Sequence, residues 1–250
     1  MTRPPAGPPG ASPAQAQALA LSQAQAHTAS EALSSAVALF NAGQTAAALQ
    51  RCQQGLTAQP AHPGLLQLLA TLLLASGDAA AALAAIEPVL LHHPGHAPAL
   101  RLAEQAALRH GAALIEHGQP AVAAGLLRRL TLAQPAGVAG WFLLALACED
   151  LHATDEAAAA LAQVLVRQPD HVEARLNLAL IEQSRGHLET ALDHHARVWR
   201  LRPALLGRIT MALCSQRSGA VWLTADALLQ ELNCRAGRLG LPPPPAPPAA

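Results

Sequence analysis

The sequence predicts an all-α protein built as a solenoid of helix-turn-helix units, and three observations support this fold class. Alanine, the residue with the highest helix propensity, accounts for 60 of the 250 residues. Aromatic residues make up only 2% of the chain, so the β-branched and aromatic runs that strands favour are scarce. Prolines, alanines and glycines also recur at intervals of about 34 residues, which is typical of solenoid repeats.

The repeat is clearest in five prolines, namely Pro60, Pro94, Pro135, Pro169 and Pro203. Successive members stand about 34 residues apart, except that seven more residues separate Pro94 from Pro135. An alanine stands twelve residues before each proline, at Ala48, Ala82, Ala123, Ala157 and Ala191, and Ala225 continues the step. Five residues before these alanines lie Gly43, Gly77, Gly118 and Gly186, with His152 in place of glycine in the fourth unit. The prolines carry the argument, because alanine coincidences are common in an alanine-rich chain.

Each unit is predicted to contain two helices. Glycine ends the first helix because it adopts positive φ without steric penalty, and Asp78 is placed to cap the second helix after Gly77. The second helix ends before the registered proline, which disfavours helix in the residue that precedes it. The registered alanine lies on the second helix, where a small side chain allows a neighbouring helix to approach closely.

The longer interval between Pro94 and Pro135 predicts a lengthened first helix rather than a loop. Seven extra residues are nearly two helical turns, so their insertion keeps the same face of the helix toward the core. Residues 97–117 contain no proline after Pro98, which suits the first turn of a helix. The last unit, residues 206–237, lacks a closing proline and is predicted to be a capping helix pair.

Residues 141–169 carry the most complete copy of the motif: Trp141-x2-Leu144-Ala145-x2-Cys148, then Ala157-x3-Leu161, then Pro169. This copy resembles the tetratricopeptide repeat, whose pattern is W-x2-L-G-x2-Y, A-x3-F and P. Aliphatic residues replace most of the aromatic ones. The resemblance covers residues 29–237 and implies a right-handed superhelical solenoid of about five repeats followed by capping helices, with the seven-residue helix extension before the third repeat.

The two ends of the chain differ from this body in composition. Residues 1–28 are rich in proline and glycine and then in glutamine and alanine, and we expect them to be partly disordered. Residues 14–30 are interpreted either as an extension of the first helix or as a frayed segment. Residues 238–250 form a polyproline tail, interpreted as a linker or plain tail, with an SH3-type ligand as the alternative.

Composition excludes several classes of function. The net charge is zero, so the chain lacks the basic excess of a nucleic-acid-binding protein. Its charges are nevertheless unevenly distributed, since residues 101–195 are acidic and residues 196–250 are basic. We interpret this asymmetry either as solvated helix faces or as a means of self-association. We expect no membrane span and no secretory signal, and the four cysteines lack metal-type spacing. A cytoplasmic, bacterial protein with structural thiols is therefore predicted.

The sequence offers no catalytic constellation and no phosphate-binding loop, so it predicts no enzyme activity and no cofactor. The nearest candidate for a metal site is a histidine group, His92, His93 and His96, at the turn around Pro94. No cysteine and, apart from Glu87, no acidic residue stands close to it, so we interpret these histidines as solvated turn residues and predict no metal.

What the resemblance implies is a concave groove lined by the first helices, in which family members hold a peptide. Carried over position by position, the lining comprises Leu33, Val37, Leu68, Leu72, Arg109, Leu143, Leu146, Leu176, Asn177, Leu180 and Met211. Arg109 and Asn177 occupy polar positions in non-adjacent repeats, so the two-carboxylate clamp known in the family is absent. An apolar groove suits an amphipathic helix with anchors at i, i+3, i+4 and i+7.

Three functions remain open at this point. The first is a non-catalytic interaction scaffold that binds another protein or peptide. The second is the regulatory or substrate-recruiting arm of a glycosyl-, sulfo- or methyltransferase supplied by another domain or chain. The third is a self-assembling scaffold, a homo-oligomer. The apolar lining could also be covered by the N-terminal glutamine- and alanine-rich segment.

Overall fold

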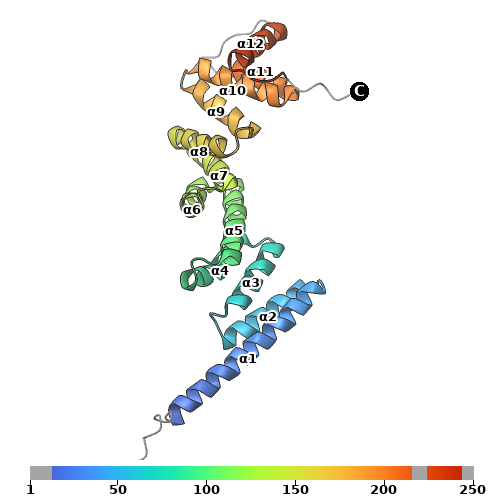
Figure 1. Ribbon diagram of the computed structural model, residues 1–250, viewed down its shortest axis with the longest axis vertical. Helices are drawn as coiled ribbons and strands as arrows, with labels where there is room; N and C mark the ends of the chain where they lie inside the picture. Colours follow the sequence, from blue (N-terminus) through green and yellow to red (C-terminus); the bar gives the residue numbers. More distant parts are fainter. Residues whose placement is uncertain (1–12, 216–223, 244–250) are drawn as a thin grey trace, which may run out of the picture. The chain divides into compact units, whose positions relative to one another are not determined.

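The computed structural model describes residues 13–215 and 224–243, and every regular element within them is a helix (Figure 1). The α-helices of these residues are α1 (Pro13–Asn41), α2 (Thr45–Ala58), α3 (Pro63–Ser76), α4 (Ala79–His92), α5 (Ala97–Glu116), α6 (Pro120–Ala133), α7 (Val138–Asp150), α8 (Thr154–Arg167), α9 (Val172–Ser184), α10 (Leu188–Leu201), α11 (Leu206–Ser215) and α12 (Ala225–Arg238). A single 3₁₀ turn, η1 (Pro203–Leu205), precedes α11. The all-α prediction is confirmed.

Four pairs of consecutive helices form hairpins, in which the odd-numbered member is the first helix and the even-numbered member the second. Within pairs, α1 packs on α2, α3 on α4, α7 on α8 and α9 on α10, while α12 packs on α10. The first helix α5 has 20 residues, whereas α3, α7 and α9 have 13 or 14. Residues 14–30, for which two interpretations were open, form part of α1.

The chain divides into two compact units, Met1–His110 and Gly111–Ala250, and each has its own apolar core. In the first unit, one cluster includes Leu65 and Leu72 of α3, and a second is centred on Ile86 of α4. In the second unit, Leu127 and Leu161 belong to a cluster formed by α5 to α9. Another cluster joins α9 and α10 to α11 and α12. Thin layers of this kind are the expected core of a repeat protein.

The turn residues lie where the sequence places them. Gly43, Gly77, Gly118 and Gly186 all have positive φ, and His152, the one exception in the glycine series, also has a φ of 57°. The side chain of Asp78 accepts a hydrogen bond from the backbone N–H of Ala81 at 2.9 Å, so the predicted cap of α4 is present. Each of the five registered prolines follows the end of a second helix by two residues.

We expect His152→Gly to stabilise the protein, by about 1 kcal/mol. The backbone at His152 is left-handed, which strains an L-residue and not glycine. Its side chain is exposed, so little packing is lost with it. Urea denaturation of both proteins measures the difference in the free energy of unfolding. A variant with equal or lower stability would contradict the prediction, and His152→Asn, which tolerates this conformation better than histidine, should fall between the two.

The registered alanines behave as predicted in the first five units and differ in the last. Ala48, Ala82, Ala123, Ala157 and Ala191 are all completely buried. Ala225 is instead exposed, because it is the first residue of α12, whereas its counterpart Ala191 is the fourth residue of α10. The fourth residue of α12 is Leu228, which is buried in the core. The 34-residue step thus reaches Ala225 in the sequence, but the burial shared by the other five alanines does not extend to it.

No helix among the described residues is both long enough and apolar enough to cross a membrane. The cysteines fall into two classes. Cys52 and Cys148 are buried, and burial raises the pKa of each thiol to about 11, which makes them unreactive packing residues. Cys214 and Cys234 are exposed, so the interpretation of all four cysteines as structural thiols holds only for the first two.

Candidate protein-binding surface

The residues predicted to line a groove all lie on first helices, but they differ in accessibility. The exposed members are Val37, Arg109, Leu180 and Met211; the partly exposed members are Leu33, Leu68, Leu143, Leu146 and Asn177; and the buried members are Leu72 and Leu176. Nine of the eleven are thus at least partly open to solvent.

Leu72 and Leu176 do not line an accessible surface, which corrects the sequence prediction for these two residues. Leu72 is fully enclosed by the cluster that joins α1, α2 and α3. Leu176 is 4% exposed and packs in the cluster that contains Ile209 and Leu213 of α11. In both helices the more accessible leucine lies one turn away, Leu68 in α3 and Leu180 in α9. The helical period alone allows either of two neighbouring stripes to face the core.

Arg109 and Asn177, predicted to occupy equivalent polar positions, have different partners in the structure. The guanidinium of Arg109 donates from Nη1 to the carbonyl oxygen of Leu74 at 3.0 Å, and so satisfies a carbonyl in the last turn of α3. The amide of Asn177 donates from Nδ2 to Oε2 of Glu149 at 3.5 Å. Arg109 lies in the first compact unit and Asn177 in the second.

Within the second unit, five residues on successive first helices define what we call the first-helix face: Leu143, Leu146, Asn177, Leu180 and Met211. Leu180 is 36% exposed and Met211 is 74% exposed. Leu143 is partly buried against the core cluster beneath α7. The first-helix face therefore includes both partly buried and exposed apolar side chains and one amide.

Polar pairs tie the helices that carry this face to one another. Arg208 of α11 donates from Nη1 and Nη2 to both carboxylate oxygens of Glu173 of α9, at 3.1 and 2.9 Å. This hydrogen-bonded guanidinium lowers the pKa of Glu173. Between α9 and α7, Asn177 bonds to Glu149, whose other oxygen, Oε1, is buried without a partner. Burial, and then the charge of Asp150, raise the pKa of Glu149.

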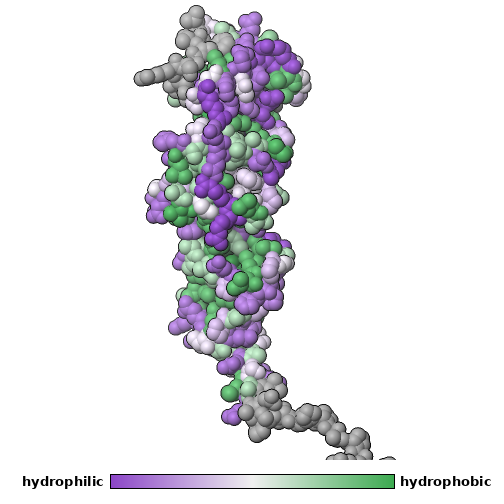
Figure 2. Space-filling model, turned by 90° about the vertical axis from the view of Figure 1, so that its left-hand side faces the viewer, coloured by the Kyte–Doolittle hydropathy of each residue, from purple (hydrophilic) through white to green (hydrophobic). Residues whose placement is uncertain are grey.

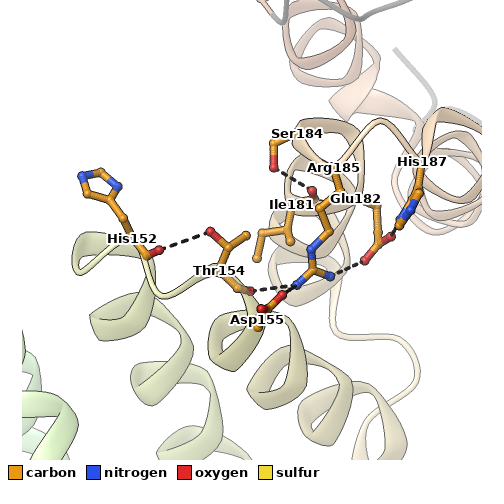
Figure 3. Close-up of polar contacts among 8 residues, drawn as sticks. All are labelled: His152, Thr154, Asp155, Ile181, Glu182, Ser184, Arg185 and His187. Atoms are coloured by element: carbon orange, nitrogen blue, oxygen red, sulfur yellow. Dashed lines mark hydrogen bonds and ion pairs between the residues drawn. The ribbon is translucent and has the colours of Figure 1, made fainter.

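A second set of contacts fixes the register between α8 and α9 on the side of the hairpin turns (Figure 3). Arg185, which follows α9, forms an ion pair of 2.5 Å with Asp155 and donates to the carbonyl oxygen of Thr154. Its Nη1 also meets Glu182 at 3.0 Å, and Glu182 in turn contacts His187 at 2.8 Å. Sequence reasoning missed this network, because Arg185 and Asp155 are 30 residues apart.

Comparison with known families accounts for the arrangement. Tetratricopeptide repeat family models match residues 39–108 and, in overlapping copies, residues 108–161 and 149–204. Together the matches span two thirds of the chain. The chain belongs to the tetratricopeptide repeat family. Such repeats bind other proteins or peptides and act as non-enzymatic interaction modules, so the chain is a protein-interaction scaffold.

Solved tetratricopeptide repeat structures share the fold. MamA 41-end from Desulfovibrio magneticus RS-1 has a TM-score of 0.51 and 21% identity, covering 71% of this chain and 96% of that one. Another MamA crystal structure gives a TM-score of 0.55 at 14% identity, with coverages of 73% and 96%. YrrB, described as a TPR protein with an unusual peptide-binding site, gives 0.51 at 18% identity, with coverages of 69% and 85%. No curated protein matches the chain significantly.

The second helices of these tetratricopeptide repeats also expose apolar side chains. Leu132 of α6 is 81% exposed and Val166 of α8 is 74% exposed. Figure 2, which draws one face of the molecule, likewise shows hydrophobic side chains exposed among hydrophilic ones. Exposure of a large apolar residue is therefore not by itself enough to mark a binding surface in this protein, and a test of the first-helix face needs a matched control on the second helices.

The histidines at the repeat turns serve as helix caps. His62, His96 and His171 each precede a first helix, and the Nδ1 of each accepts a hydrogen bond from the backbone N–H three residues on, at 3.1 to 3.2 Å. Nδ1 of His92 instead forms a hydrogen bond with the carbonyl oxygen of Pro88. Among the described residues, no group of three histidine, cysteine or acidic side chains is arranged to hold a metal ion.

Proposed function

We propose that this scaffold holds an amphipathic helix of a partner protein against the first-helix face, without chemistry of its own. The observation that carries the proposal is the location of the exposed Leu180 and Met211, which lie with the partly exposed Leu143 and Leu146 on successive first helices. First helices, not second helices, line the groove expected for this family. Methionine suits such a role because its flexible thioether adapts to the side chains of a partner.

The chemistry of the face favours an apolar ligand with a few polar contacts. Full burial of a leucine or methionine side chain contributes about 1.5–3 kcal/mol, so several anchors at helical spacing give a specific interaction. The ion pair between Arg208 and Glu173 and the contact between Asn177 and Glu149 offer polar groups beside the apolar ones. The peptide-binding site named for YrrB, which shares the fold, supports a peptide as the class of ligand.

The proposal is tested by affinity capture from the source cells with the full chain and two matched double variants. Leu180→Glu with Met211→Glu places charges on the first-helix face, and Leu132→Glu with Val166→Glu places the same charges on the second helices. We expect the wild-type protein and the second-helix variant to retain the same partner. The first-helix variant should retain at least tenfold less of this partner, because burial of an unpaired carboxylate in the interface is strongly unfavourable.

Two further results would decide against the proposal. Equal retention of the partner by all three proteins would place the binding surface elsewhere. Recovery of the chain alone, together with a dimer or larger assembly of the wild-type protein in light scattering, would show a self-assembling scaffold. Circular dichroism of both variants checks that the helices remain folded.

A further inference from the structure

Arg175 occupies a position in α9 that holds an aromatic residue one repeat earlier. Trp141 of α7 is its counterpart in that repeat, and the indole Nε1 donates to the carbonyl oxygen of Pro135 at 2.9 Å. Arg175 makes the equivalent bond, since its Nη2 donates to the carbonyl oxygen of Pro169. Its side chain is nearly enclosed, with 9% of the residue exposed, and Nε is buried without a hydrogen-bond partner. A guanidinium thus takes the position of an indole and keeps the hydrogen bond to the carbonyl oxygen of the registered proline.

The second helix of the same repeat adds a second guanidinium and an imidazole near this site. His194 and Arg197 of α10 take the positions that Ala160 and Gln163 of α8 hold one repeat earlier, so neutral residues give way to basic ones around Arg175. Nδ1 of His194 is buried and has no hydrogen-bond partner. Burial, followed by the charges of Arg175 and Arg197, lowers the pKa of His194 to about 4. Burial and then Arg197 also lower the pKa of Arg175.

The carboxylates nearby do not neutralise this cluster through hydrogen bonds. Asp170 acts on Arg175 only through its charge. Glu182 and Asp193 act on His194 in the same way, but Glu182 is bonded to Arg185 and His187, and Asp193 is bonded to Arg235. Within the described part of the chain, Arg175, His194 and Arg197 have no carboxylate in hydrogen-bond contact. Because the pKa of His194 is about 4, its ring is neutral near pH 7, and the charge of the cluster comes from the guanidiniums of Arg175 and Arg197. Two guanidiniums without a hydrogen-bonded carboxylate favour an anion between them.

We propose that Arg175, His194 and Arg197 form a binding site for a phosphate group, either a free ion or a phosphate carried by a partner. Guanidinium groups match the geometry of phosphate oxygens and form charge-assisted hydrogen bonds with them. The site lies between α9 and α10, and it is independent of the first-helix face and of the partner proposed for it.

Thermal unfolding of the full chain in sodium phosphate and in sodium chloride of equal ionic strength tests the proposal. We expect phosphate to raise the Tm of the wild-type protein by about 2–4 °C. Arg197→Gln should remove most of this shift in Tm, because it should lower the affinity for phosphate about tenfold. In chloride the same variant should have a higher Tm than wild type, because it relieves the repulsion with Arg175. Arg129→Gln, at an exposed arginine of α6, is the control and should keep the full phosphate shift.

A second measurement is specific to the site. Nuclear magnetic resonance titration of His194 should show its pKa rising when inorganic phosphate is added, since an anion favours the imidazolium. O-phospho-L-serine, used in place of phosphate, shows whether the site accepts a phosphate group attached to a side chain. An equal phosphate shift in the wild-type and Arg197→Gln proteins, or no shift in either, overturns the proposal. Neither result bears on partner capture by the first-helix face.

Discussion

Replacement of His195 by leucine is expected to stabilise the protein and to make it less sensitive to acid. His195 of α10 is completely buried, and neither ring nitrogen has a hydrogen-bond partner. One repeat earlier the same position holds Leu161, which is also completely buried. Leucine therefore fits the local geometry and carries no polar group. We expect a gain of about 1–3 kcal/mol in the free energy of unfolding at pH 8, the cost of an unsatisfied buried polar group.

The larger effect of His195→Leu concerns pH. Burial, and then the neighbouring His194, lower the pKa of His195 from its ordinary value of 6.5 to about 4. Between these two values the unfolded chain takes up a proton that the folded chain does not. The free energy of unfolding is therefore unaffected by this residue's titration above pH 6.5 and decreases as the pH falls toward 4. The loss is about 3 kcal/mol for this residue.

Urea denaturation of wild-type protein at pH values from 8 to 4.5 measures this slope. His194, whose pKa is also lowered to about 4, adds a second proton to the wild-type slope. His195→Leu should therefore remove about half of the pH dependence. His195→Gln separates the two effects, because it keeps a buried polar group but does not titrate: it should flatten the slope without raising stability at pH 8. A leucine variant with the wild-type slope would contradict the assignment.

The equivalence of Leu161 and His195 depends on the repeat register, which could be predicted from the sequence. The repeat register, the glycine turns and the proline stops depend on the backbone preferences of single residues, and these were confirmed by the structure. The left-handed conformation at His152 follows from the same register, although histidine is a poor residue for it. Local rules of this kind carry over from one unit to the next without knowledge of the packing.

Features that depend on packing between units were harder to predict. Leu176 and Leu180 are both apolar and one turn apart, and only the packing of α11 on α9 decides that Leu176 is buried. The exposure of Ala225 could be predicted only if the first residue of α12 were known. The last unit has no glycine in register to mark that residue. The contacts of Arg185 with Asp155 and of Arg208 with Glu173 join residues 30 and 35 apart, and no short motif marks them.

Arg235 of α12 is the second residue whose replacement should have a large effect. The sequence suggested only that arginines gather at the basic end of the chain. In the structure Arg235 is 6% exposed and bonds to three carboxylates: Glu189 at 2.7 Å, Asp193 at 3.2 Å and Glu231 at 2.5 Å. Glu189 and Asp193 belong to α10, so one guanidinium joins the last helix to the preceding repeat.

We expect Arg235→Ala to lower the free energy of unfolding by about 2–3 kcal/mol, because Arg235 is buried but its carboxylate partners are partly exposed, which reduces the effect below that of a fully buried ion pair. The substitution leaves three carboxylates close together without their cation. Arg235→Lys should recover only part of the loss, because an ammonium group cannot reproduce the fixed fork of donors that reaches all three acids. Arg238→Ala is the matched control: Arg238 is 62% exposed and contacts Glu231 at 3.5 Å, so its removal should change stability by less than about 0.5 kcal/mol.

Hydrogen exchange distinguishes the two ways in which this loss can occur. If Arg235 mainly anchors α12, the amides of residues 225–238 should lose protection in Arg235→Ala while those of α7 and α8 keep it. Terminal helices of a repeat array open independently when their interface weakens, because each unit contacts only its neighbours. Uniform loss of protection across residues 111–238 would instead show that α12 unfolds together with the rest of its compact unit. Unchanged protection and unchanged urea stability would contradict the role given to Arg235.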